Sequence, residues 1–180
     1  MKVLYVAPEF PNNNENATQV RASQLLVKLA KHVELHVLGF SQDIDGEVSI
    51  PGLYIKAMSP GKPGLLSVLS SKPRAFYRHA FPDSTAIFTE MLHQVQPDIV
   101  HFDTIATFGL CEVLLDLDLE CNPTIILHPH DAMSRLYASQ VDVEENILRR
   151  IYLRSQLKKI KHMENNLYPK ADLCFVDSLD

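Results

Sequence analysis

The sequence contains no tryptophan, only three cysteines, and no excess of basic residues. Cys111, Cys121 and Cys174 are odd in number and show no short metal-binding spacing such as CxxC, so we expect no disulfide framework and no cysteine-ligated metal. The 17 Lys and Arg stand against 22 Asp and Glu, a net charge of -5. This balance argues against a protein that binds nucleic acid by neutralising phosphates.

Long apolar runs are absent as well, so no segment is expected to cross a bilayer. The amino-terminal segment MKVLYVAPEF is interrupted by Pro8 and Glu9 too early for a signal peptide. With 46% hydrophobic and 22% charged residues, the composition is that of a globular protein, and 180 residues can build one hydrophobic core. We therefore predict one domain, located in the cytoplasm.

Glycine is missing from the region where a nucleotide-binding loop is usually found. None occurs between Met1 and Lys31, which excludes a GxGxxG dinucleotide site, and neither GxxxxGKS nor GxxxxGKT occurs anywhere in the chain. The asparagine-rich segment 9–18 leads into a predicted helix and can hydrogen-bond a sugar, with an ordinary solvated loop as the alternative.

Short apolar runs alternate with helical patterns along the whole chain. Strands are predicted at 2–7, 33–38, 53–58, 98–102, 123–128 and 171–176. Helices are predicted at 18–32, 84–96, 105–116 and 143–168, and the proline-containing stretch 59–75 is predicted to be irregular around a short helix at 65–70. This alternation predicts a Rossmann-like, three-layer α/β/α fold with a doubly wound parallel sheet.

The segment LHPHD, which follows a predicted strand, holds the densest group of reactive side chains. His130 is the candidate for a catalytic or substrate-facing group, with a hydrogen-bonded loop histidine as the alternative. Asp131 orients His130 or caps a turn. His128 and His130 could also bind a metal together with His101, Asp103 or Asp131, although Pro129 works against the strand geometry that this requires.

A basic stretch runs from Ile147 to Met163 without any acidic residue, although the chain as a whole is acidic. Apolar residues interleave at helical spacing with six cations: Arg149, Arg150, Arg154, Lys158, Lys159 and Lys161. Such a helix can lie on an anionic membrane or hold a phosphate. An ordinary solvated helix face is the alternative.

Several segments, in order, resemble the N-terminal domain of a GT-B-fold glycosyltransferase, in particular of glycosyltransferase family 4. MKVLYVAPEFP resembles the opening strand and its aromatic-Pro turn, and VRASQLLVKLAKHVELHVLGF resembles the first helix and second strand. QPDIVHFDT, TIILHPHDAMSRLY and LYPKADLCFVDSLD resemble three later strands with their loops. Each motif has low specificity by itself, and the order and spacing of the motifs carry the resemblance.

The resemblance implies that His130 lies beside the acceptor and the transferred sugar and contacts a hydroxyl group without acting as a nucleophile. Asp131 and Arg135 follow on the acceptor side, and Ser178 matches a small polar residue after the last strand. In such a parallel sheet, ligands bind at the carboxyl ends of the strands. Together with the resemblance, this defines the substrate-binding candidates Asn16, Ala17, Thr18, Arg21, His101, Asp131, Arg135 and Ser178.

The first loop departs from the family pattern. The family often has a Gly-Gly pair there, at the positions of Ala17 and Thr18, so close approach of the backbone to a donor diphosphate is in doubt. Arg21, one turn into the helix, remains a candidate anion contact.

The resemblance also implies a domain organisation and partners. Residues 1–180 correspond to the acceptor-binding half, and a donor-binding domain is expected beyond Asp180. The implied reaction transfers a sugar from a nucleotide-sugar to the hydroxyl of a sugar, lipid or other acceptor, with no cofactor and no metal. It is expected to be retaining, and the half chain alone is expected to have negligible activity.

Two other functions remain open from the residues alone. The chain could be a free-standing flavodoxin-like binding module, although Glu9 is the only acidic residue directly after the first strand. It could also be a metallohydrolase that uses His128, His130 and Asp131.

Overall fold

Six parallel strands form one sheet in the order β3-β2-β1-β4-β5-β6. The computed structural model describes residues 1–9, 17–40, 53–58, 61, 70, 72–77, 79–130 and 132–176. At residues 17, 18, 53, 75 and 77 it describes the backbone only. The strands are β1 (Lys2–Ala7), β2 (Glu34–Phe40), β3 (Leu53–Met58), β4 (Ile99–Phe102), β5 (Thr124–Leu127) and β6 (Leu173–Cys174). The strand order reverses between β1 and β4, where open α/β sheets bind ligands.

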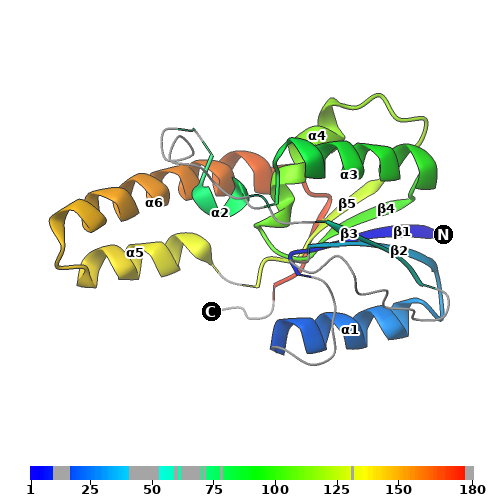
Figure 1. The fold of residues 1–180 in the computed structure, drawn as a ribbon, viewed down its shortest axis with the longest axis horizontal. Coiled ribbons are helices and arrows are strands. Elements are labelled where there is room, and N and C mark those ends of the chain that lie inside the picture. The colour runs from blue at the N-terminus through cyan, green and yellow to red at the C-terminus, as the bar shows by residue number, and fades with distance from the viewer. Residues whose placement is uncertain are drawn as a thin grey trace.

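Helices cover both faces of this sheet, as Figure 1 shows. The helices are α1 (Ala17–Leu29), α2 (Arg74–Tyr77), α3 (Pro82–Val95), α4 (Cys111–Asp116), α5 (Met133–Val143) and α6 (Ile147–Leu167). Two 3-10 helices, η2 (Thr107–Leu110) and η3 (Tyr168–Lys170), connect them. Helix α1 lies on one side of the sheet, and α3 and α4 lie on the other. The predicted Rossmann-like α/β/α class is confirmed.

The core divides into two clusters because side chains alternate along each strand. In β1, Leu4 and Val6 join the larger cluster, which includes residues of α3, α4 and α6. Val3, Tyr5 and Ala7 of the same strand join the smaller cluster under α1. Both faces of β1 are therefore buried, as expected for a central parallel strand.

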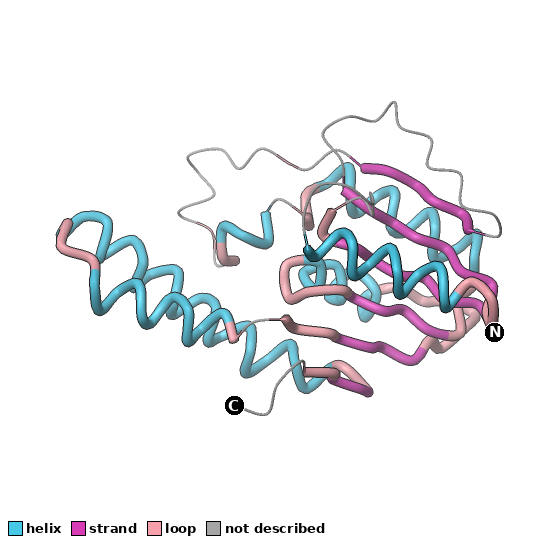
Figure 2. The backbone as a smooth tube through the Cα atoms, turned by 90° about the horizontal axis from the view of Figure 1, so that it is seen from below, coloured by secondary structure: helices cyan, strands magenta, loops and turns pink. Residues whose placement is uncertain are grey.

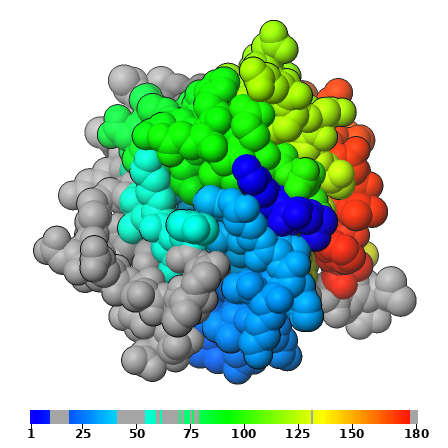
Figure 3. Space-filling view, turned by 90° about the vertical axis from the view of Figure 1, so that its right-hand side faces the viewer, coloured from blue at the N-terminus to red at the C-terminus, as the bar shows by residue number. Residues whose placement is uncertain are grey.

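The amino-terminal ends of the strands are tied together by charge. The backbone N–H of Lys2 donates to Asp98 Oδ2 (2.6 Å), and the Lys2 ammonium donates to the carbonyl of Val95 (3.1 Å). Figure 3 looks onto this end, where the first residues, in blue, lie beside α3, in green. The functional candidates lie at the other end of the strands.

Two predicted helices were wrong in extent. The helix predicted at 143–168 corresponds to α6, which begins only at Ile147. A separate helix, α5, precedes it and ends at Val143. Asn146 stops the helical pattern, because its side chain caps α6 by accepting from the N–H of Arg149 (3.0 Å). The helix predicted at 105–116 starts later, as η2 followed by α4.

The last strand was also too long in the prediction, since only Leu173 and Cys174 pair with β5. The short helix predicted at 65–70 falls almost wholly outside the described residues.

Helices α5 and α6 form a hairpin that extends well away from the sheet (Figures 1 and 2). The end of α6 that is nearer the sheet contributes Met163 and Leu167 to the larger core cluster. None of the described helices combines the length and the apolarity that crossing a membrane requires.

The core predicts a large cost for truncating Phe102. This fully buried ring lies 5.2 Å from the ring of Phe108 and 6.0 Å from that of Phe88. We expect Phe102→Ala to lower the free energy of unfolding by about 4 kcal/mol, because it leaves a cavity. The half-exposed Leu115 is the control, and Leu115→Ala should cost roughly 0.5 kcal/mol. Urea denaturation followed by circular dichroism measures both, and equal costs would contradict this packing.

Candidate functional site

The candidate site lies where β1, β4 and β5 end side by side. The backbone N–H of Asp103 donates to the carbonyl of Val6 (2.9 Å), and the N–H of His128 donates to that of Phe102 (3.0 Å). These bonds extend the sheet ladder one residue past each strand. The backbone of Asp103 and His128 is therefore fixed by the sheet.

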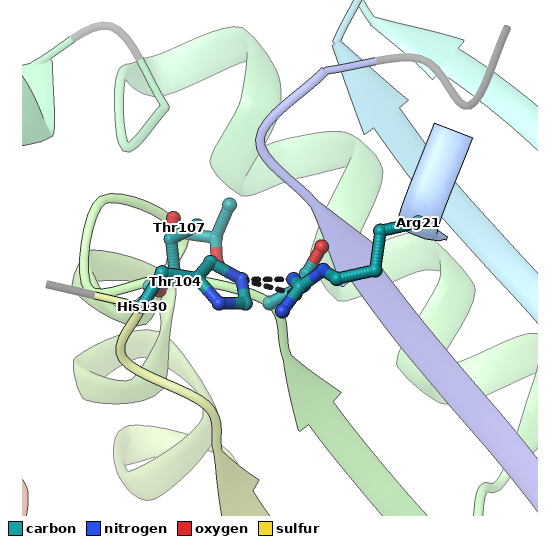
Figure 4. A network of polar contacts seen from close by, with 5 residues as sticks. Arg21, Thr104, Thr107 and His130 are labelled. Atoms are coloured by element: carbon teal, nitrogen blue, oxygen red, sulfur yellow. Dashed lines mark hydrogen bonds and ion pairs between the residues drawn. The ribbon is translucent and has the colours of Figure 1, made fainter. Parts of the chain in front are cut away.

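Asp103, His130 and Arg21 form one polar network at this edge. Figure 4 shows Arg21 and His130 pointing toward each other. The Oδ1 atom of Asp103 lies 2.7 Å from His130 Nε2 and 3.1 Å from Arg21 Nη2. Arg21 Nη2 also contacts His130 Nε2. The side chain of Asp103 is fully buried, that of His130 is 16% exposed, and that of Arg21 is 37% exposed. The carboxylate is thus the fixed centre, and Arg21 is the partner nearest to solvent.

The contacts at His130 Nε2 determine where its proton lies. One ring nitrogen cannot donate to a carboxylate and accept from a guanidinium at once. We assign the proton to Nε2, because Asp103 Oδ1 is within a short hydrogen-bond distance and accepts only. In the neutral ring, Nδ1 then carries no proton and is the ring nitrogen that can accept a hydrogen bond or a proton.

The turn after β4 carries backbone strain next to Asp103. Thr104 has φ of 121°, a conformation that non-glycine residues rarely adopt. The Thr107 hydroxyl donates to the carbonyl of Thr104 (3.0 Å) and so holds the turn closed. Strain of this kind persists where the surrounding structure requires one geometry, and here it sets the position of Asp103.

The electrostatics keep Asp103 charged. Burial alone would raise the pKa of Asp103, but the hydrogen bond from His130, the nearby Tyr5 hydroxyl and the Arg21 guanidinium outweigh it, so the pKa lies below its ordinary value. Burial lowers the pKa of His101 to about 4, against the opposing effect of Asp103, so this ring is neutral at pH 7. Burial and then the charge of Asp103 raise the pKa of Tyr5.

Several buried polar atoms at this edge have no hydrogen-bond partner within the described part of the chain. They are Tyr5 Oη, His101 Nε2, Asp103 Oδ2 and Thr104 Oγ1. An unsatisfied buried polar atom costs free energy, so such atoms are rare and need an explanation. A polar ligand or ordered water at this edge would satisfy them.

A metal ion is the other group that this edge could hold. Ligand atoms of Asp103, His128 and His130 all lie within 4.8 Å of one another, and the rings of the two histidines are 4.4 Å apart. The guanidinium of Arg21 donates to Oδ1 of Asp103 and so places a positive charge beside this carboxylate. This fixed positive charge makes the site a poor fit for a divalent cation.

The structure brings three of the predicted site residues together: Arg21, His101 and His130. Arg135 lies in the first turn of α5 and is exposed. Asn16, Asp131 and Ser178 lie outside the described residues, and Ala17 and Thr18 are described only as the first residues of α1.

Sequence reasoning missed the central role of Asp103, which it considered only as a metal ligand. Asp103 occupies the orienting position that was assigned to Asp131. The signal was present in IVHFD, where an acidic residue directly follows a buried strand. The role of Tyr5 had no sequence signal, because it depends on Asp103 at the end of the neighbouring strand. The strained backbone of Thr104 had no sequence signal either.

No protein-family model and no curated protein matches the sequence. Several solved structures are similar in fold. Sucrose-phosphate synthase from Thermosynechococcus elongatus matches 98% of the chain, with a TM-score of 0.58 and 11% identity. A structure of Phytolacca americana UGT2, complexed with UDP-2fluoro-glucose and pterostilbene, matches 99% of the chain, with a TM-score of 0.55 and 11% identity. LpCGTa in complex with UDP matches 98% of the chain, with a TM-score of 0.54 and 12% identity.

These neighbours have the GT-B fold, which consists of two Rossmann-like halves. The chain spans about half the length of each of these proteins: 47% of the sucrose-phosphate synthase, 48% of UGT2 and 47% of LpCGTa. At such low identity the similarity concerns fold alone. The chain therefore has the architecture of one Rossmann-like half of a GT-B protein.

The network predicts how stability depends on pH. The lowered pKa of Asp103 means that its charge stabilises the fold above about pH 4, the ordinary pKa of Asp, and that this contribution is lost as the pH falls through the folded-state value. Asp103→Asn should lower the free energy of unfolding by about 2 kcal/mol at pH 7. The difference from wild type should shrink below about pH 4.

Urea denaturation between about pH 2 and pH 8 measures this difference, because the range extends to both sides of the ordinary pKa of Asp. The exposed Asp118 provides the control, since Asp118→Asn should change stability by no more than about 0.5 kcal/mol at any pH. A difference for Asp103→Asn that stays constant to the lowest pH would mean that its charge contributes nothing.

Proposed function

We propose that this chain is the acceptor-binding half of a glycosyltransferase that transfers a sugar from a nucleotide-sugar to an acceptor hydroxyl. One observation carries the proposal: a hydrogen-bonded His130–Asp103 pair stands at the carboxyl edge of the sheet in a fold that matches one half of GT-B proteins. Two of the neighbours are complexed with UDP or with UDP-2fluoro-glucose, which supports a nucleotide-sugar as donor. The order of the sequence motifs supports family 4 within this fold.

In this proposal His130 binds the reacting hydroxyl. With the Nε2 proton held by Asp103, Nδ1 can accept a hydrogen bond from a hydroxyl of the acceptor or of the transferred sugar. The new bond joins the acceptor oxygen to the anomeric carbon, and the bond from that carbon to the nucleoside diphosphate breaks. Asp103 is a positioning residue, because it acts through His130.

Arg21 has the matching role toward negative charge. Its guanidinium lies at the amino-terminal end of α1, more exposed than Asp103, and it can stabilise charge that develops on a diphosphate leaving group. The remaining donor contacts belong to a second Rossmann-like half, in keeping with the half-length matches. We propose that no resident metal is needed, because Arg21 supplies the positive charge.

The rival function is that of a metallohydrolase, which the cluster of Asp103, His128 and His130 favours. The two proposals differ in their requirement for metal. Elemental analysis of the purified protein for zinc and manganese decides between them, since stoichiometric metal that is lost in His128→Ala would favour the hydrolase.

The main test is an activity assay of the complete gene product with a panel of nucleotide-sugars, in which release of the nucleoside diphosphate is measured. We expect His130→Ala to lower kcat/KM by about 100-fold or more, because it removes the group that binds the hydroxyl. The exposed His93 on α3 provides the matched control, and His93→Ala should retain nearly full activity. Full activity of His130→Ala would refute the role of His130.

A second expectation concerns the 180-residue chain itself. Assayed alone with the same nucleotide-sugars, it should show negligible turnover, because the site of a two-domain transferase closes between the halves. Turnover by this chain equal to that of the complete gene product would refute its assignment as the acceptor half.

A further inference from the structure

The outer end of the α5–α6 hairpin exposes large apolar side chains. Val143, Ile147, Leu148 and Ile151 are 78%, 64%, 79% and 58% exposed, and we call these four residues the apolar tip. They come from the end of α5 and the first turns of α6, at the part of the molecule farthest from the sheet (Figures 1 and 2). A group of exposed apolar residues indicates an interaction surface.

A row of cations continues from the apolar tip along α6. Arg150, Arg154, Lys158 and Lys161 are spaced by four, four and three residues, so they share one side of the helix, and we call them the basic row. Arg154, Lys158 and Lys161 are exposed, and Arg150 is half-buried.

The other side of α6 is already occupied. Leu153, Gln156, Ile160 and Met163 are buried there, and Gln156 accepts a hydrogen bond from the backbone of Arg74 in α2 (2.9 Å). The apolar tip and the basic row therefore lie outside the packed face.

The charges of the hairpin favour an anionic partner. From Met133 to Leu167 there are seven Lys and Arg against four Asp and Glu, whereas the whole chain has a net charge of -5. One of the acids, Glu144, is already paired with Arg149 (2.9 Å). Asp142 and Glu145 are exposed near the tip, and no acid lies on α6 before Glu164.

We propose that the α5–α6 hairpin docks on an anionic lipid surface. The apolar tip enters the boundary between headgroups and acyl chains, and the basic row contacts the anionic headgroups. A lipid surface fits better than a folded protein partner, because the apolar residues lie at a projecting end and the cations run along the helix behind them. The remaining, negatively charged part of the chain is held away from the surface. This proposal does not depend on the function of the candidate site.

Vesicle flotation of the 180-residue chain tests the proposal. We expect binding to vesicles of phosphatidylcholine mixed with phosphatidylserine, little binding to phosphatidylcholine alone, and weaker binding as salt is raised. Absence of binding to the mixed vesicles, or equal binding to both kinds, would overturn it.

Two double variants separate the contributions of charge and apolar contact. Arg154→Glu with Lys158→Glu reverses the basic row, and Leu148→Ser with Ile151→Ser removes half of the apolar tip. Each should weaken binding by about tenfold or more. The matched control is Lys28→Glu with Lys31→Glu, which makes the same charge change at exposed positions in and after α1 and should leave binding within about twofold.

Circular dichroism establishes that each variant is folded, and because all of the changed residues are exposed, we expect normal spectra. If the control variant lost as much binding as the variant of the basic row, the net charge of the chain would explain the effect. That result would overturn the role of the hairpin. Sedimentation velocity tests the remaining alternative, which is that the apolar tip binds a second copy of the chain. A dimer that Leu148→Ser with Ile151→Ser dissociates would assign the apolar tip to self-association and overturn the lipid proposal.

Discussion

The buried carboxylate of Asp103 is the interaction on which the rest of the site depends. It has no exposed surface, so it must be charge-paired and hydrogen-bonded to be tolerated. His130, from the loop after β5, and Arg21, from α1, meet this need. The strained turn at Thr104 follows directly after the carboxylate. A fixed charge of this kind determines which nitrogen of His130 carries the proton, and thus what that residue can do.

The sheet explains why these groups meet. Parallel strands bring their carboxyl ends to one edge, and open α/β sheets bind ligands where the strand order reverses, which is here between β1 and β4. Each face of β1 is used: Leu4 and Val6 build the larger cluster, whereas Tyr5 on the other face reaches toward Asp103. The alternation that builds the core therefore also supplies a polar group to the site.

Much of the architecture followed from sequence pattern, because buried parallel strands are short apolar runs and proline and glycine mark their ends. The strand 53–58 was predicted at its observed bounds. The errors fall where local pattern is ambiguous. Helix α5 was not predicted, and the helix predicted from residue 143 begins only at Ile147, after the cap at Asn146. In the site, His130 and Arg21 were predicted, whereas Asp103 was considered only as a metal ligand.

The sequence by itself determined the fold class and the strand ends at which functional groups would lie, because hydrophobic periodicity reports burial directly. It also showed that the acidic chain contains a basic helix. Only the tertiary structure decided that Asp103 pairs with His130 and Arg21, since these residues are 27 and 82 positions away from it along the chain. It alone showed that the apolar residues at the start of α6 are exposed and not packed. Pairing and exposure depend on which elements become neighbours, and neither is encoded in any local stretch of residues.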